Sequence, residues 1–199
     1  PSTSCGLALA ATDVDIKDTP YSSPFDFSIV SSSTPGAFAI DATSGMLSTT
    51  AAAKLDHEAT PEATVRVRVT DSSGATGEAI VTVLVTDVNE APVFAHSSYS
   101  FQVAENANFQ EEVDIVSATD PDKADTLRFT LKVDSAPTGG LMSDLAINPS
   151  TGKVFVARKT AAAVASPQEY LPQGGVYTCT ATAQDNGAGG LTATTQVIV

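Results

Sequence analysis

Oxygen-bearing side chains gather where apolar-alternating segments of this chain end. The clearest group is the bridge Asp87–Pro92 (DVNEAP), which follows the alternating run 79–85 and precedes another at 99–103. The proline at its end stops a strand ladder from continuing. Clustered carboxylates and an amide suit Ca²⁺, which takes about 6–8 oxygen ligands. Taken alone, the bridge reads as an acidic linker without an ion; further acidic motifs reverse that interpretation.

Three more acidic elements stand at the ends of expected strands. They are the segment 55–58 (LDHE), the segment 120–122 (DPD) and Asp185. In an extended Asp-x-Glu, residues i and i+2 point the same way. We therefore expect Asp56 and Glu58 to reach one pocket while His57 points away as a solvated side chain. An Asp-His-Glu trap for a transition metal stays open as an alternative, and it requires His57 to turn inward.

Composition narrows the class of protein. The net charge of −13 argues against nucleic acid and against docking on anionic lipid. No apolar run approaches the roughly 20 residues of a membrane span, so we expect no direct membrane insertion. Cys5 and Cys179 fall in different predicted domains, and a disulfide between them is not expected. The chain lacks an initiator Met and ends within a strand, which suggests a piece of a longer protein.

The chain contains an internal repeat. Two pairs of segments share one offset of 107 positions, namely 11–15 with 118–122 and 38–45 with 145–152. A third pair, 69–74 with 183–187, is offset by 114 positions, so an insertion falls within about 160–175. Two copies of one domain follow, with predicted boundaries at 1–91 and 92–199.

Both copies show the period of two that is typical of strands. The alternating segments are 25–29, 65–69, 127–131 and 177–183. In the segment 65–69 the valines are expected inward and the arginines outward. Turn signals at Gly45, Gly74, Gly152 and Gly187 separate these runs. The sequence therefore predicts an all-β fold, with a sandwich of about seven strands in each copy.

The acidic elements resemble the calcium motifs of cadherin repeats. The segment 55–58 is similar to their Leu-Asp-Arg-Glu element, the bridge to their Asp-x-Asn-Asp-Asn linker, and 120–122 to their Asp-x-Asp turn. Asp185 matches the aspartate of Ala-x-Asp, and 105–107 (ENA) is similar to Pro-Glu-Asn. The resemblance covers nearly the whole chain. It implies two tandem Greek-key β-sandwiches, arranged end to end.

The resemblance also implies Ca²⁺ at the interdomain junction. The implied ligands are Asp56, Glu58, Asn89, Glu90, Asp120, Asp122 and Asp185. So many carboxylates could not all stay ionised together without cations, and two or three Ca²⁺ would balance them. The linker departs from the family pattern in being one residue shorter and in having Glu90 where aspartate is usual. Incomplete outer sites are implied at Asp13, Asp15, Asp71 and Glu105.

The implied function is a calcium-stiffened adhesion or spacer module, extracellular and at the cell surface, in the ectodomain of a larger single-pass membrane protein. Its implied partners are other cadherin-type domains of the same chain, and homophilic and heterophilic protein adhesion both stay open. The absence of tryptophan gives no support to a swapped-strand anchor. The alternative is a ligand- or carbohydrate-binding surface module in a large microbial-type surface protein. No catalytic motif is present, so no enzyme is predicted.

Overall fold

The computed structural model describes residues 8–12, 25–105, 107–157 and 174–199. Cys5, Asp13, Asp15 and most of the predicted insertion lie outside these described residues. The chain divides into two compact units, Pro1–Val88 and Asn89–Val199. The division falls inside the acidic bridge, slightly before the boundary expected at Ala91. Within the described ranges, no helix has the length and hydropathy needed to cross a membrane.

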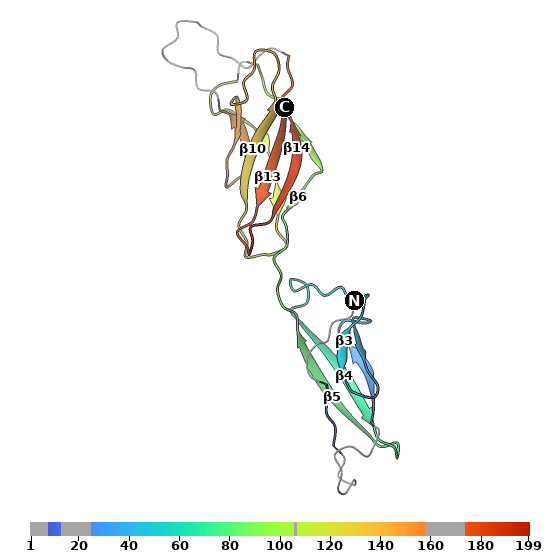
Figure 1. The fold of residues 1–199 in the computed structure, drawn as a ribbon. Coiled ribbons are helices and arrows are strands. Elements are labelled where there is room, and N and C mark those ends of the chain that lie inside the picture. Colours follow the sequence, from blue (N-terminus) through green and yellow to red (C-terminus); the bar gives the residue numbers. More distant parts are fainter. Residues whose placement is uncertain (1–7, 13–24, 106, 158–173) are drawn as a thin grey trace. The chain divides into compact units, whose positions relative to one another are not determined.

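The first unit has five strands in its described part. They are β1 (Asp26–Ser32), β2 (Phe38–Ile40), β3 (Leu47–Thr49), β4 (Glu62–Thr70) and β5 (Thr76–Leu84). Strands β1, β4 and β5 form an antiparallel sheet in that order, while β2 and β3 pair as a hairpin (Figure 1). The core between them is built from Ala37, Phe38, Leu47, Ala63 and Val65.

Strand β4 confirms the predicted alternation. Val65 and Val67 are 0% and 3% exposed, and full burial of a valine contributes about 1.5–3 kcal/mol. Arg66 and Arg68 lie on the outer face and pair with Glu78 of β5, at nitrogen–oxygen distances of 3.5 and 2.7 Å. The alternation and the cross-strand pairs together fix the register of β4 against β5.

The described part of the second unit also consists of strands and loops without a helix. Its strands are β6 (Val93–Phe94), β7 (Ser98–Ser100), β8 (Glu112–Ile115), β9 (Ala118–Thr119), β10 (Arg128–Ser135), β11 (Leu145–Ile147), β12 (Lys153–Val156), β13 (Thr178–Gln184) and β14 (Thr192–Ile198). One sheet has the order β10-β13-β14-β7, with β7 parallel to β14 (Figure 1). A second sheet has the order β11-β12-β8, and β6 pairs with β9.

Strand β13 carries the predicted inward face. Tyr177, just before it, and Cys179, Ala181 and Ala183 within it are all buried, at 3% exposure or less. Burial raises the pKa of the free Cys179 thiol to about 11. Because the thiolate is the reactive form, this cysteine is a packing residue at neutral pH.

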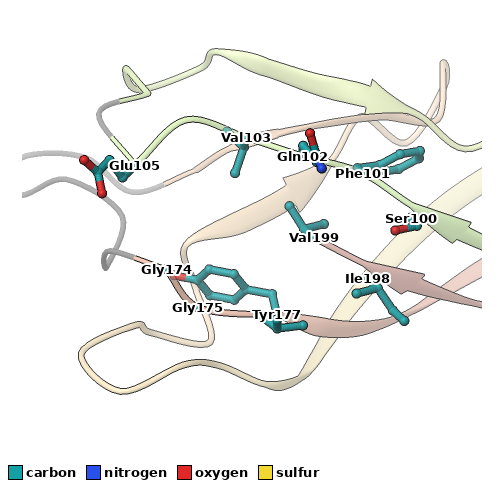
Figure 2. A pocket seen from close by; sticks show the side chains of 11 residues that line it. Ser100, Phe101, Gln102, Val103, Glu105, Gly174, Gly175, Tyr177, Ile198 and Val199 are labelled. Atoms are coloured by element: carbon teal, nitrogen blue, oxygen red, sulfur yellow. The ribbon is translucent and has the colours of Figure 1, made fainter.

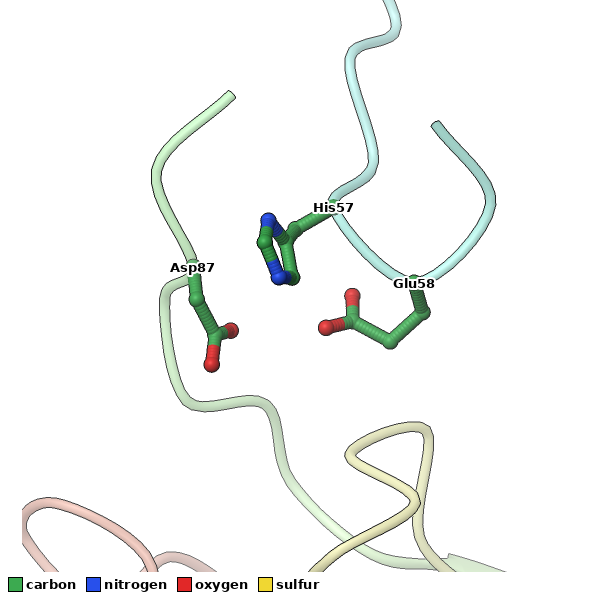
Figure 3. Close-up of side chains that lie close together, drawn as sticks. All are labelled: His57, Glu58 and Asp87. Carbon is green, nitrogen blue, oxygen red and sulfur yellow. The ribbon is translucent and has the colours of Figure 1, made fainter. Parts of the chain in front are cut away.

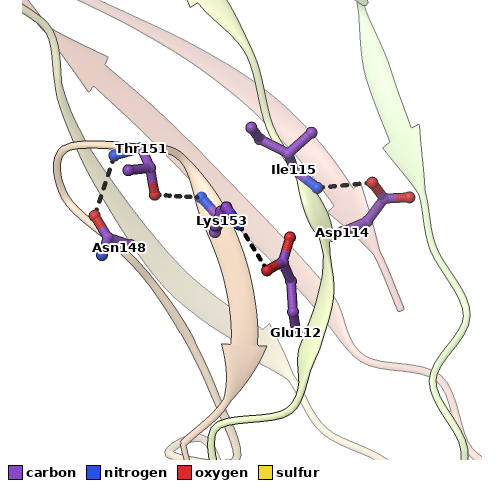
Figure 4. A network of polar contacts seen from close by, with 6 residues as sticks. All are labelled: Glu112, Asp114, Ile115, Asn148, Thr151 and Lys153. Carbon is purple, nitrogen blue, oxygen red and sulfur yellow. Dashed lines mark hydrogen bonds and ion pairs between the residues drawn. The ribbon is translucent and has the colours of Figure 1, made fainter.

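A turn that occurs in both units explains the match between the segments 38–45 and 145–152. Before β12, Asn148 Oδ1 accepts hydrogen bonds from the amides of Ser150 and Thr151, as Figure 4 shows for Thr151. Gly152 follows with φ +70°, and a Cβ there would collide with the Val116 carbonyl oxygen. Lys153 then reaches Glu112 of β8 at 2.8 Å.

The same turn occurs in the first unit. Asp41 Oδ1 accepts from the amides of Thr43 and Ser44 and from the Ser44 hydroxyl, and Gly45 has φ +67°. Since a non-glycine residue rarely adopts positive φ, the turn glycine is required at both places. Of the predicted turn glycines, Gly187 differs, because it is not among those with positive φ.

Candidate metal centre

In the second unit, the bridge residues are held against two acidic loops. The Asn89 side-chain amide donates to Asp185 Oδ2 at 3.0 Å, and the backbone amide of Glu90 donates to Asp122 Oδ2 at 2.9 Å. These four residues were all expected in one site, and the structure joins them as two hydrogen-bonded pairs. These contacts join segments more than thirty residues apart in the chain.

Asp185 is the most buried member, with 6% of its surface exposed. It follows β13, and its Oδ1 accepts from the backbone amides of Gly187 and Leu191 at 3.1 and 3.0 Å. One oxygen thus closes the loop between β13 and β14, while the other meets Asn89.

The loop after β9 contributes three acids. Carboxylate oxygens of Asp120, Asp122 and Asp125 lie within 4.8 Å of one another. The Asp122 amide donates to Asp120 Oδ1 at 3.0 Å. The other oxygen, Asp120 Oδ2, is buried and accepts no hydrogen bond from the described residues. A buried carboxylate oxygen in a like-charged cluster is the arrangement that a cation would stabilise.

Asp125 was missed by the sequence analysis. It lies near the others because its amide donates to the Asp122 carbonyl at 2.9 Å, which closes a tight turn. A Cβ added at Gly187 would collide with both Asp125 Oδ2 and Asn89 Oδ1. The two oxygens therefore converge on one point, and the missing side chain of Gly187 leaves room for them. The signal available in the sequence was the Asp-x-x-Asp spacing, which the resemblance did not highlight.

The first unit holds a separate group. Ligand atoms of His57, Glu58 and Asp87 lie within 4.8 Å of one another, and Figure 3 shows the three side chains facing a common space. Asp87 was not in the predicted ligand set. The expectation that His57 points away is wrong, because residues 57–59 form a turn and not an extended segment.

Asp56 explains that turn. Its Oδ1 accepts from the Ala59 amide at 3.0 Å, and its carbonyl accepts from the Thr60 amide at 2.8 Å. A side chain that caps its own turn reverses the chain and removes the alternation on which the expectation relied. Asp56 is exposed, and its role as a ligand stays a prediction.

The two described residues of the implied outer sites have different surroundings. Asp71 Oδ1 accepts from the Ser73 hydroxyl, the Ser73 amide and the Ala75 amide at 2.7, 2.8 and 2.9 Å. These hydrogen bonds, the Ser73 hydroxyl first, hold the pKa of Asp71 below its usual value. Glu105 is exposed and borders a cavity of about 580 Å³ (Figure 2).

The cavity beside Glu105 bears on the carbohydrate-binding alternative. Its lining includes Phe101, Val103, Tyr177 and Val199. Tyr177 is 3% exposed, and its hydroxyl donates to Asp144 at 2.5 Å. The ring is therefore part of the core and offers no open face on which a sugar could stack.

Comparisons with known proteins agree with the motifs. The Cadherin domain family matches residues 2–86. The Drosophila melanogaster protein "Protocadherin-like wing polarity protein stan" is 33% identical over 189 residues, which is 94% of this chain and 5% of that protein. Human "Protocadherin Fat 4" is 31% identical over 156 residues, or 77% of this chain and 3% of that protein. The chain thus spans a small part of these relatives.

Solved structures show the same fold. "Protocadherin Gamma B2 extracellular cadherin domains 3-6" has a TM-score of 0.62 at 26% identity, covering 88% of this chain and 40% of that one. Mouse Cadherin-23 EC22-24 has a TM-score of 0.66 at 23% identity, covering 97% and 58%. Cadherin homologues are adhesion proteins and not enzymes, in agreement with the prediction that this chain is not an enzyme. With its all-β domains and its repeated acidic motifs, the chain belongs to the cadherin repeat family.

Proposed function

We propose that this chain is a calcium-binding adhesion or spacer module of a cell-surface ectodomain, with Ca²⁺ ordering the junction between its two units. The observation that carries the proposal is the attachment of the bridge to the acidic loops. Asn89 is bonded to Asp185, and Glu90 is bonded to Asp122. A cation among these carboxylates would tie the bridge to the second unit more firmly than two hydrogen bonds alone.

The donor set of the second unit fits calcium. Asn89, Glu90, Asp120, Asp122 and Asp185 offer only oxygen, which is the ligand type of this hard cation. Asp125 adds one more carboxylate to the predicted set. The buried Asp120 Oδ2, which accepts no hydrogen bond from the described residues, is an acceptor that a cation would satisfy.

Charge explains why the ion would matter. Two ionised carboxylates whose oxygens lie within 4.8 Å of each other repel by about 3.5 kcal/mol or more at an effective dielectric constant of 20. Bound Ca²⁺ would supply positive charge that turns this repulsion into attraction. Without it, the loop that carries Asp120, Asp122 and Asp125 would loosen, and the bridge would lose its anchor.

The proposed calcium site also includes residues of the first unit, because the bridge connects the two units directly. Only Val88 separates Asp87 of the first unit from Asn89 of the second. We therefore assign Asp56 and Glu58, with the newly found Asp87, as the first unit's share of the calcium ligands. Neighbouring cadherin-type domains of the same longer chain would be the module's nearest partners.

Small-angle X-ray scattering with and without a calcium chelator tests this function. In millimolar calcium we expect a narrow distribution of interdomain distances, and a broader one after chelation. Asp122→Ala should show the broad distribution even with calcium, whereas Asp114→Ala, on exposed β8, should behave as wild type. Identical profiles with calcium and with chelator would contradict the proposal.

A further inference from the structure

We propose that His57, Glu58 and Asp87 form a binding site for a divalent transition-metal ion of the zinc class. The three side chains come from two segments of the first unit, the turn after Asp56 and the bridge that follows β5. Their ligand atoms lie within 4.8 Å of one another. Figure 3 shows the imidazole between the two carboxylates.

The imidazole is oriented by a contact outside this group. His57 Nδ1 lies 2.8 Å from the Val85 carbonyl oxygen. Because a carbonyl can only accept, Nδ1 carries a proton, and in the neutral imidazole Nε2 then keeps its lone pair for a metal ion. Metal-binding histidines commonly donate their second ring nitrogen to a backbone carbonyl in this way, which fixes the tautomer and the ring orientation.

The backbone around the group is also tied down. The Val85 amide donates to the Pro61 carbonyl at 3.0 Å, which extends the pairing of β4 and β5 toward the group. On the other side, Asp56 caps the turn that carries His57 and Glu58 through its bond to the Ala59 amide. The acceptor of the imidazole and the turn are thus both positioned before any ion arrives.

The ligand types select the ion. Calcium takes oxygen ligands, so it would use the two carboxylates and leave the oriented imidazole aside. One imidazole and two carboxylates instead suit zinc and its first-row neighbours. Three protein ligands leave a fourth position for water.

Closing around an ion needs a small adjustment. Zinc–ligand bonds of about 2.1 Å place tetrahedral ligands about 3.4 Å apart, and the three ligand atoms lie within 4.8 Å of one another, so side-chain movement must take up any separation beyond about 3.4 Å. Glu58 has rotatable bonds, and Asp87 is exposed, so side-chain rotation can supply this. Glu58 and Asp87 are also proposed calcium ligands, and the two ions would compete for them. The transition-metal site itself does not depend on calcium, because all three residues lie in the first unit.

Titration of the whole chain with Co²⁺ in calcium-free buffer, followed by the visible absorption of the bound ion, tests the inference. We expect a saturable signal that Zn²⁺ abolishes. His57→Gln should weaken Co²⁺ binding at least about tenfold, since even the loss of a residue supporting a ligand costs 10–100-fold. His96→Gln is the matched control, because His96 is the only other histidine. Equal affinities for wild type and His57→Gln would overturn the proposal.

A second measurement uses only the wild-type protein and therefore does not depend on whether a variant folds. Nuclear magnetic resonance of the wild-type imidazole nitrogens during Zn²⁺ titration should move Nε2 of His57 and leave His96 in place. Unmoved His57 resonances, or equal shifts in both histidines, would overturn the proposal even if His57→Gln failed to fold.

Discussion

Asp71 and Asp185 occupy equivalent positions in the two copies of the repeat, each just after a long strand. Both use Oδ1 to close the following loop, Asp71 through Ser73 and Ala75, and Asp185 through Gly187 and Leu191. They differ in the second oxygen. Asp185 Oδ2 meets the Asn89 amide, whereas the side-chain hydrogen bonds that Asp71 accepts from Ser73 and Ala75 all end on Oδ1.

The difference shows how an aspartate at one repeated position can serve two purposes. The aspartate is first a loop-closing residue, and this role needs only its own copy of the repeat. It becomes a candidate metal ligand where a bridge residue and further acids gather around it. In the second unit, Asn89 donates a hydrogen bond to Asp185, and Asp125, which belongs to the acidic group with Asp120 and Asp122, lies close to Gly187 in the loop after Asp185. Asp13 and Asp15, which match Asp120 and Asp122 in the repeat, lie outside the described residues.

The largest expected effect separates these two aspartates. Asp185→Asn keeps an oxygen for the Gly187 and Leu191 amides but removes the negative charge beside Asn89. We expect calcium affinity to fall at least about tenfold, or about 1.4 kcal/mol, and the rise in melting temperature on adding calcium to shrink accordingly. Asp71→Asn should keep the full calcium-induced rise. Melting curves with chelator and with millimolar calcium measure both, and equal responses would refute the distinction.

A smaller effect is expected from filling the space at Gly187. Gly187→Ala adds a Cβ that collides with Asn89 Oδ1 and Asp125 Oδ2. These oxygens must then move apart, and calorimetric titration should show weaker calcium binding. Gly77→Ala is the control, because a Cβ there meets only Val69 at an ordinary 3.5 Å. Unchanged affinity in Gly187→Ala would mean that the two oxygens do not belong to the site.

The smallest expected effect is on how the melting temperature depends on pH. The Ser73 hydroxyl and the loop amides lower the pKa of Asp71 from 3.8. A lowered pKa means that the ionised carboxylate stabilises the fold above the unfolded pKa, and that this stabilisation disappears as pH falls through the folded pKa. Wild type should therefore melt above Asp71→Ala at pH 7 in chelator, with the gap narrowing below about pH 4. If the difference in melting temperature between wild type and Asp71→Ala did not change with pH, the charge of Asp71 would not contribute to stability.

Period-two alternation predicted the strands well, because alternate residues of a strand face opposite sides and one side is buried in the core. Val65, Val67, Cys179 and Ala181 all lie where the pattern placed them. The sequence predicted the loops less well than the strands. Asp56 closes a turn and brings His57 toward Glu58, which no strand pattern indicates. Tertiary proximity likewise added Asp87 and Asp125 to the acidic groups, because their neighbours are set by loop closure and not by strand periodicity.

Calorimetric titration of Asp122→Ala and Asp13→Ala with calcium tests the central claim most directly. Asp122 accepts a hydrogen bond from the Glu90 amide at 2.9 Å within the acidic loop of the second unit, whereas the cadherin resemblance assigns Asp13 to an outer site and not to the junction. We expect a saturable calcium-binding heat in wild type, a nearly unchanged one in Asp13→Ala, and a strongly weakened one in Asp122→Ala. Equal losses in the two variants, or no calcium-binding heat in wild type, would contradict a calcium site at the junction.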